Sequence, residues 1–254
     1  MDTRELGRTG IPVSRLCFGT GTNGWNGRSM QTDLGLQELA DLLRYAYDRG
    51  VTFWDSADQY GSHPHVAGAL DDLDRQTVQI ATKTCAKTAS EAESDIDRYL
   101  RELGTNYLDV VLLHCMSDSN WTETHAGAME VLRDRKEAGV IRAHGVSCHD
   151  LGALRRAAEI PWVEVVLARI NHAGKNMDGS PKKVVPVLEQ MDDAGIGVYG
   201  MKVLSLGKLK PEGAIDYALD LPSLDAITIG MKSRREVDEN IGWVEAHDRA
   251  LQPA

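Results

Sequence analysis

The chain has 254 residues, 42% of them hydrophobic, which is enough for one large core or two small ones. It has 28 Lys and Arg residues against 38 Asp and Glu residues, a formal net charge of −10, and such an acidic chain argues against binding to nucleic acid or to an anionic membrane surface. The first residues contain no apolar run and no stretch approaches membrane-spanning length, so we expect a cytoplasmic protein without a membrane partner.

Short apolar segments that predict strands alternate with longer amphipathic segments that predict helices along the whole chain. The inward stripe of the first helix is formed by Leu39, Leu42, Leu43 and Ala46. At the start of the third helix, Ser90 with Glu93 is a capping-box pattern. In chain order, the expected strand–helix pairs are Leu16–Gly19 with Leu36–Arg49, Thr52–Asp55 with His65–Leu70, Gln79–Lys83 with Ala89–Leu103, Leu108–His114 with Ala126–Ala138, Ala143–Ser147 with Leu151–Glu159, Val163–Ile170 with Val184–Ala194, Gly197–Lys202 with Pro211–Asp220, and Ala226–Gly230 with Arg234–His247.

Eight strand–helix pairs favour a closed parallel barrel, because right-handed crossovers place the helices outside a buried sheet. An open doubly wound sheet is the alternative, but no G-x-G-x-x-G pattern in helical context follows the first strand. Before the barrel, the segment Arg4–Arg15 has turn signals at Gly7 and Thr9-Gly10 between short apolar runs. We therefore expect an α/β fold, a (β/α)8 TIM barrel with an N-terminal β-hairpin, as a single domain over residues 1–254.

Four ionisable residues fall at or just after predicted strands. They are Asp55, Tyr60, Lys83 and His114. A strand that is apolar along its length and ends in such a residue delivers it to one rim, and the C-terminal rim of a parallel barrel is where chemistry is assembled. A carboxylate, a phenol, an ammonium and an imidazole that meet there predict a proton-transfer site.

The four cysteines are widely spaced and form no C-x-x-C pair, so we expect reduced thiols. Cys85, Cys115 and Cys148 follow or end three consecutive predicted strands, with His149 close. A soft-metal or redox role is one interpretation. The favoured interpretation is that they pack as small hydrophobic residues.

His63-Pro64-His65 is a His-x-His pattern of the kind found in metal-dependent barrel hydrolases. Here it follows Tyr60-Gly61 and leads into a helix, so the strand context of such a site is missing. We therefore expect loop histidines and assign no metal ligand.

Motifs spread over the chain carry a resemblance to a known family. They are Leu6–Gly10 (LGRTG) with Val13-Ser14, Phe18–Gly21 (FGTG), Phe53–Gly61 (FWDSADQYG), Ala81–Lys83 (ATK), Leu112–His114 (LLH), Gly145–Ser147 (GVS), Ile227–Gly230 (ITIG) and Glu239-Asn240. With these motifs the chain resembles the aldo-keto reductases over essentially its whole length. The spacing Asp-x-x-x-x-Tyr-Gly, with a Lys and a His at later strand ends, is its most specific part.

The resemblance implies reduction of an aldehyde or ketone to an alcohol by NAD(P)H. It implies that Tyr60 is the general acid, that Lys83 lowers the pKa of the phenol, that Asp55 holds Lys83, and that His114 hydrogen-bonds the substrate oxygen. The implied partners are NADP, with NAD possible, and a small-molecule carbonyl substrate; the oligomeric state is left open. The implied cofactor-binding residues are Gly19, Thr20, Asp55, Ser147, Cys148, Met201, Lys202, Gly230, Lys232, Ser233, Glu239 and Asn240.

The cofactor site departs from the family pattern more than the catalytic site does. Cys148 stands where many members have Asn, Leu167 where they have Gln, and Met201 where an aromatic ring stacks on the nicotinamide. A thioether can pack against that ring, and Lys202 is expected near the pyrophosphate. Cationic side chains in Gly230–Glu236 favour the extra phosphate of NADP, although Glu236 stands where many NADP-dependent members carry a basic or amide residue.

The chain also ends soon after the last expected helix, which predicts a short member without the family's C-terminal loop and with an open or shared pocket. These departures keep two alternatives open. One is a same-fold enzyme that uses the four residues for non-redox proton transfer, such as elimination or epimerisation. The other is a non-catalytic dinucleotide-binding subunit.

Overall fold

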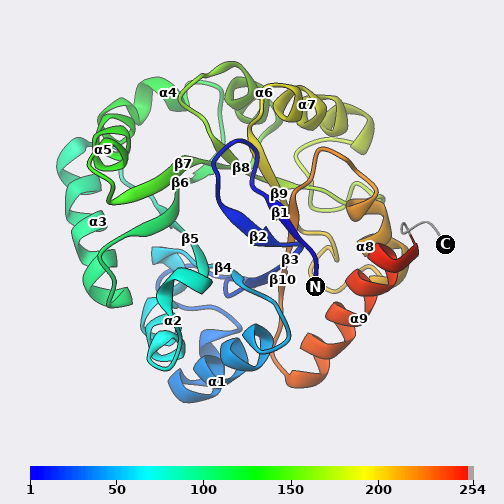
Figure 1. Cartoon of the computed structure of the whole chain (residues 1–254). Coiled ribbons are helices and arrows are strands. Elements are labelled where there is room, and N and C mark those ends of the chain that lie inside the picture. The colour runs from blue at the N-terminus through cyan, green and yellow to red at the C-terminus, as the bar shows by residue number, and fades with distance from the viewer. Residues whose placement is uncertain (251–254) are drawn as a thin grey trace.

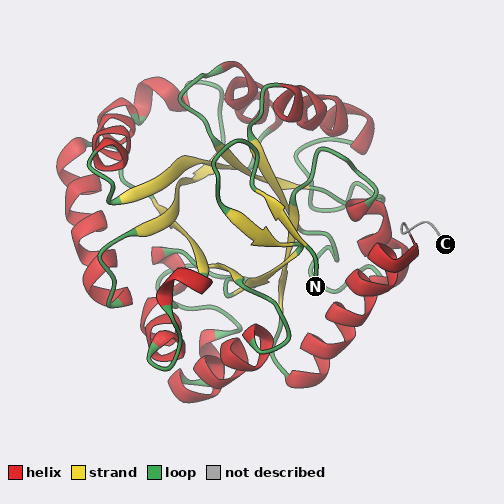
Figure 2. Cartoon of the chain, in the orientation of Figure 1, coloured by secondary structure: helices red, strands yellow, loops and turns green. Residues whose placement is uncertain are grey.

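Eight parallel strands close into a barrel in the order β10-β3-β4-β5-β6-β7-β8-β9, and helices surround it (Figure 1, Figure 2). The computed structural model describes residues 1–250. The expectation of a missing C-terminal loop concerns Leu251–Ala254, which lie outside the described residues. The expected (β/α)8 barrel is confirmed. Within residues 1–250 we find no helix long and apolar enough to cross a membrane.

The barrel strands are β3 (Leu16–Gly19), β4 (Phe53–Asp55), β5 (Gln79–Thr84), β6 (Leu108–Met116), β7 (Ile141–Cys148), β8 (Val165–Arg169), β9 (Gly197–Met201) and β10 (Ala226–Gly230). The helices are α1 (Leu36–Tyr47), α2 (His63–Leu70), α3 (Ala89–Leu103), α4 (Trp121–Thr124), α5 (Ala126–Glu137), α6 (Leu151–Glu159), α7 (Pro181–Asp193), α8 (Pro211–Leu219) and α9 (Arg234–Ala250), with 3-10 turns η1 (Thr32–Leu34), η2 (Asp58–Tyr60) and η3 (Arg75–Thr77).

The capping box of α3 is formed by different residues from those expected. Thr88 accepts a hydrogen bond from the N–H of Glu91, and the Glu91 carboxylate accepts the N–H of Thr88 in return. The expectation of Ser90 with Glu93 was wrong because α3 begins at Ala89, so Ser90 already lies inside its first turn.

The expected N-terminal hairpin is confirmed and lies across one end of the barrel (Figure 1). Its strands are β1 (Thr3–Glu5) and β2 (Pro12–Ser14). Leu6, Ile11 and Val13 are fully buried and join the inner core formed by inward-facing strand residues. The hairpin thereby fills one end of the barrel with apolar side chains and leaves the other end for polar groups.

The alternation of side chains along each strand decides which residues face the interior. On β6, Val110 and Leu112 belong to the inner core, so His114 extends the same inward row by one step. Val111 and Leu113 instead pack in the outer core between strands and helices. The same alternation turns Asp55 and Lys83 inward at the ends of β4 and β5.

Asp225, just before β10, ties the hairpin to the barrel. Its Oδ2 accepts the N–H of Gly7 in the hairpin turn and of Val198 on β9, both at 3.0 Å. Burial raises the pKa of Asp225 to about 6, although these two N–H donors oppose the shift. A carboxyl group whose pKa is raised by folding contributes most stability when it is protonated, and this contribution falls as the pH rises through the folded pKa.

We expect Asp225→Ala to lower the free energy of unfolding by about 1–3 kcal/mol, because two partly buried N–H groups lose their acceptor. Asp225→Asn keeps an acceptor and cannot ionise, so its stability relative to wild type should increase from pH 4 to pH 7. Urea unfolding at several pH values measures both effects. A constant difference between Asp225→Asn and wild type over this range would contradict the prediction.

Candidate active site

Asp55 and Lys83 form a buried ion pair at the C-terminal rim of the barrel. Lys83 is fully buried and its Nζ donates to Asp55 Oδ1 and to the carbonyl oxygen of Ser56, both at 2.7 Å. The hydroxyl of Tyr199 on β9 donates to the same Asp55 oxygen at 2.8 Å. Burial opposes the ammonium charge, but the Asp55 charge, Tyr60 and the hydrogen bond outweigh it and raise the pKa of Lys83. Lys83 therefore stays charged.

Tyr60 approaches this pair from a turn rather than from a strand. It ends η2, and Arg98 of α3 donates to Asp58 Oδ1 of the same turn at 2.6 Å. The Nζ of Lys83 lies 4.8 Å from the centroid of the Tyr60 ring. The turn thus places the phenol beside the ammonium that can stabilise its anion.

Two glycines of the loop after β3 pack directly on the Tyr60 ring. A Cβ on Gly21 would lie 2.2 Å from Tyr60 Cε2, and one on Gly24 would lie 2.4 Å from Cδ1. The same loop is tied to the Tyr60 turn because the N–H of Gly27 donates to the carbonyl oxygen of Gln59 at 2.9 Å. Only residues without a side chain allow this approach, so the loop backbone holds the ring in place.

His114 faces the Tyr60 hydroxyl. The Tyr60 oxygen and His114 Nε2 are 3.5 Å apart, and the two rings meet edge to face with centroids 5.5 Å apart. Burial, with smaller contributions from the charges of Lys83 and His149, lowers the pKa of His114 to about 2. His114 is therefore a neutral imidazole, and its buried Nδ1 has no hydrogen-bond partner within residues 1–250.

The pKa of Tyr60 differs from the sequence-based expectation. Burial raises it to about 12; the Lys83 charge lowers it as expected, but does not outweigh the burial. The sequence predicted the direction of the Lys83 effect, but it does not show that desolvation of the partly buried phenol is the larger effect. Tyr60 consequently carries its proton at neutral pH.

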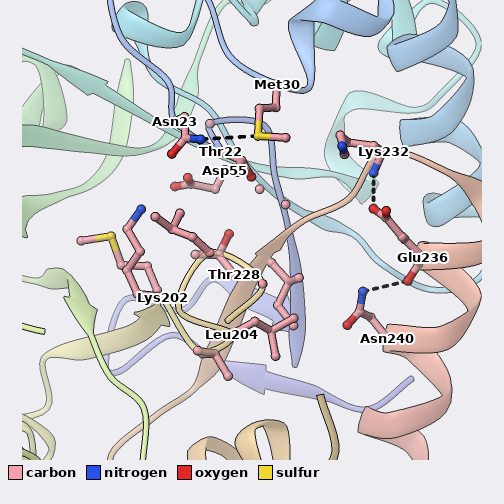
Figure 3. Close-up of a pocket in the computed structure, with 18 of the residues that line it drawn as sticks. Thr22, Asn23, Met30, Asp55, Lys202, Leu204, Thr228, Lys232, Glu236 and Asn240 are labelled. Carbon is pink, nitrogen blue, oxygen red and sulfur yellow. Dashed lines mark hydrogen bonds between the residues drawn. The ribbon is translucent and has the colours of Figure 1, made fainter. Parts of the chain in front are cut away.

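A cavity of about 430 Å³ extends from these residues to the start of α9 (Figure 3). This volume lies in the range of small-molecule sites. The cavity is lined by Gly19, Gly21, Thr22, Asn23, Met30, Asp55, Tyr60, Leu167, Met201, Lys202, Val203, Leu204, Leu206, Gly207, Pro211, Thr228, Ile229, Gly230, Lys232, Glu236, Glu239 and Asn240.

Most of the residues expected to bind a cofactor line this cavity: Gly19, Asp55, Met201, Lys202, Gly230, Lys232, Glu239 and Asn240. Four others are not among the lining residues. Thr20 is buried and donates to the carbonyl oxygen of Asp55, Ser147 Oγ accepts the N–H of Cys115, and Ser233 Oγ accepts the N–H of Glu236.

Cys148 is the fourth of the expected cofactor-binding residues that do not line the cavity. It is fully buried in the outer core between strands and helices, because its neighbour Ser147 takes the inward position of β7. Cys85 and Cys115 are half-buried, and all four cysteines are free. Cys148 therefore does not join Cys85 and Cys115 at the rim.

The structure also shows site residues that sequence reasoning missed. Tyr199 contacts Asp55, and its inward place on β9 follows from strand alternation, which is the signal that could have identified it. The loop after β9 forms one wall of the cavity through Leu204 and Leu206. This loop has left-handed backbone at Lys202, Ser205 and Leu206, and nothing in the sequence apart from Gly207 indicates it.

The two histidines of the His-x-His pattern lie in the first turn of α2, so the expectation of loop histidines was wrong. His63 Nδ1 lies 2.7 Å from Glu102 Oε2 and its Nε2 lies 2.7 Å from Thr82 Oγ1, so both ring nitrogens have protein partners. No group of three or more His, Cys, Asp or Glu side chains within residues 1–250 is arranged to hold a metal ion.

Comparisons with known proteins show the family to which this chain belongs. A soybean protein named probable aldo-keto reductase 1 is 27% identical over 87% of this chain, which spans 65% of that relative's length. The NADH-specific methylglyoxal reductase of Escherichia coli is 25% identical, over 84% of this chain and 70% of its own length. A solved structure from Pseudomonas aeruginosa, described as an aldo-keto reductase, has a TM-score of 0.82 at 23% identity, covering 96% of this chain and 95% of its own, and this likeness shows the fold alone. The model of the aldo/keto reductase family matches residues 15–219. The chain therefore belongs to the aldo/keto reductase family.

Proposed function

We propose that this protein reduces the carbonyl group of a small aldehyde or ketone to an alcohol, with a nicotinamide dinucleotide as the hydride donor. One observation carries the proposal: the protonated hydroxyl of Tyr60 lies 3.5 Å from neutral His114, beside the buried ammonium of Lys83, at one end of a cavity. Carbonyl reduction needs an acid next to donors that hold the substrate oxygen, and these residues supply both.

The residues along the cavity fit a dinucleotide. Leu167 and Met201 in the cavity lining offer apolar surface against which a nicotinamide ring can pack. At the other end, Lys232 and the first turn of α9 offer a cation and backbone N–H groups to an anionic group. A nicotinamide dinucleotide bound there would supply the hydride that adds to the carbonyl carbon.

Each catalytic residue has a role that follows from its geometry. Tyr60 donates its proton to the carbonyl oxygen, and the Lys83 ammonium stabilises the phenolate that is left. Asp55 keeps Lys83 charged and in position through their 2.7 Å contact. Neutral His114 can donate one ring N–H to the substrate oxygen, which orients the carbonyl and stabilises charge on it as the carbon is reduced.

The two alternative functions are less well supported. Elimination or epimerisation needs a base that removes a proton from carbon, but Tyr60 is protonated and the pKa of His114 is about 2, so both are poor bases at neutral pH. A non-catalytic dinucleotide-binding subunit would have no use for the arrangement of Asp55, Tyr60, Lys83 and His114.

We expect Tyr60→Phe to lower kcat for aldehyde reduction by about 10²-fold or more, because the proton donor is lost. The dissociation constant for NADH or NADPH, measured by tryptophan fluorescence, should change by less than about threefold, since the hydroxyl is not needed for cofactor affinity. Tyr47→Phe, which removes a hydroxyl on α1 far from the cavity, is the matched control. Wild-type turnover by Tyr60→Phe would refute the assignment of the acid.

We expect Gly24→Ala to lower kcat by about tenfold or more, because its Cβ would displace either the loop or the Tyr60 ring, and small misplacements of a catalytic group are costly. Gly242→Ala is the control, since no atom outside the neighbouring residues and backbone of α9 lies within 4 Å of a Cβ at that position. Steady-state kinetics with the same aldehyde compare the two variants. Equal activities would show that the glycine does not position the ring.

We further propose that this protein prefers NADH to NADPH, although the cationic side chains in Gly230–Glu236 favoured NADP when the sequence was considered alone. Glu236 lines the cavity, and its carboxylate accepts the N–H of Lys232 at 2.7 Å. The extra phosphate of NADPH would be repelled there by the negative charge of Glu236. Arg234 lies over the Tyr45 ring and Arg235 pairs with Glu239, so both guanidiniums have other partners. The similar E. coli protein is named NADH-specific.

Glu236→Gln should therefore tighten binding of NADPH relative to NADH by about threefold to tenfold, as expected for removal of one partly exposed like charge. Fluorescence titration with both dinucleotides measures the ratio, and Glu245→Gln, on α9 outside the cavity lining, is the control. Tighter binding of NADPH than of NADH by the wild-type protein would overturn this preference.

A further inference from the structure

A second group of polar side chains lies at the C-terminal rim, next to the catalytic residues. Arg169 ends β8 and pairs in register with Met201, the last residue of β9, which Lys202 follows. His149 follows β7, and its Nε2 lies 3.6 Å from the Sγ of Cys115. We call Arg169, Lys202 and His149 the rim cluster; it borders the catalytic site because Cys115 directly follows His114.

The charges of the rim cluster are only partly balanced. Arg169 donates to Asp178 Oδ1 at 3.1 Å and also contacts His149 Nδ1. Burial and the charges of Arg169, Lys202 and Lys83 lower the pKa of His149 to about 3, so this ring is neutral. Lys202 has no carboxylate oxygen within 4.0 Å of its Nζ among residues 1–250, although it is half-buried.

The cations Lys83 and Arg169 each have a carboxylate partner at this rim, whereas Lys202 has none among residues 1–250. Asp55 balances Lys83 and Asp178 balances Arg169, while Lys202 is left over. The protein as a whole carries a net charge of −10, which repels anions at long range, so any preference of this rim for an anionic ligand has to come from the local positive charge. Burial, and then the charge of Arg169, lower the pKa of Lys202, as expected of a cation with no nearby anion.

The Lys202 side chain extends toward the catalytic end of the cavity. Figure 3 shows its ammonium near the end where Asp55 lies, with Lys232 and Glu236 at the other end. Its backbone has a φ of 62°, which is unfavourable for a residue with a side chain, and the side-chain amide of Asn171 donates to its carbonyl oxygen at 3.1 Å. Strained backbone held in this way is frequent at ligand-binding positions.

We propose that Lys202, supported by Arg169, binds a carboxylate group of the substrate, so that the substrates are small aldehydes or ketones that carry a carboxylate. The inference rests on the proposed carbonyl reduction and names its substrate class. A half-buried ammonium without a counterion gains more from an incoming carboxylate than an exposed one does, because less water competes for both charges. The carbonyl group would then lie toward Tyr60 and His114.

The pyrophosphate of the dinucleotide is the other anion that Lys202 could bind, and the test separates the two. The substrates are 4-carboxybenzaldehyde and its methyl ester, which have the same ring and aldehyde but differ in charge. The variants are Lys202→Met, which removes the ammonium at similar length, and Lys202→Arg, which keeps a positive charge. Lys208→Met removes an exposed ammonium from the same loop and is the matched control.

For the wild-type protein, kcat/KM should be roughly tenfold or more higher for the acid than for the ester, the size expected of one charge-assisted contact. Lys202→Met should bring the ratio close to one, while Lys202→Arg and Lys208→Met should keep it. Equal rates for acid and ester in the wild type would overturn the proposal. An unchanged ratio of acid to ester kcat/KM in Lys202→Met would also overturn it. If that variant in addition bound NADH more weakly, Lys202 would be assigned to the pyrophosphate.

A binding measurement distinguishes failure of this inference from failure of the proposed function. Trp25 is half-exposed and its ring centroid lies 6.0 Å from that of His114, so its fluorescence should report binding at the rim. One outcome is that no aldehyde is reduced, but that the acid binds more tightly than the ester in this fluorescence titration and Lys202→Met removes the difference. The reductase assignment then fails and the carboxylate site stands. Equal binding of acid and ester would refute the carboxylate site whether or not turnover occurs.

Discussion

The candidate site depends on the buried ion pair between Asp55 and Lys83. A fully buried ammonium is costly unless it is paired and its protons are satisfied, and here Asp55 and the carbonyl oxygen of Ser56 accept from it. Tyr199 on β9 is a second donor to the same Asp55 oxygen. The barrel makes this possible, because strands distant in sequence turn their inward residues toward one centre while the hairpin fills the opposite end.

The pair also determines what Tyr60 can do. Burial keeps the proton on the phenol, whereas Lys83 lowers the free energy of the anion that forms when the proton leaves. In the proposed reaction Tyr60 would therefore hold its proton until an acceptor arrives and would then be stabilised as the conjugate base. Neutral His114 suits the same task, since it can donate a hydrogen bond without adding a positive charge next to Lys83.

Periodicity and strand ends predicted most of this architecture. The bounds of β3, β10, α3 and α6 agree with the expected ones, and Asp55, Lys83 and His114 were predictable because each lies at or near the end of an apolar strand. Three-dimensional proximity was harder to predict. That Gly21 and Gly24 pack on Tyr60, or that Leu204 forms a cavity wall, depends on loop paths that have no periodic pattern. Cys148 was misplaced for a simpler reason, since strand alternation directs it outward once Ser147 faces inward.

The cavity is electrostatically asymmetric, and the asymmetry links the two proposals. At the α9 end, the carboxylates of Glu236 and Glu239 accompany Lys232, so an additional phosphate would meet negative charge. At the catalytic end the unpaired ammonium of Lys202 leaves a positive excess. An anionic substrate would thus be drawn to the end where Tyr60 lies, and a cofactor without the extra phosphate would suit the opposite end. Both preferences follow from where a few charged side chains lie within a chain whose overall charge is negative.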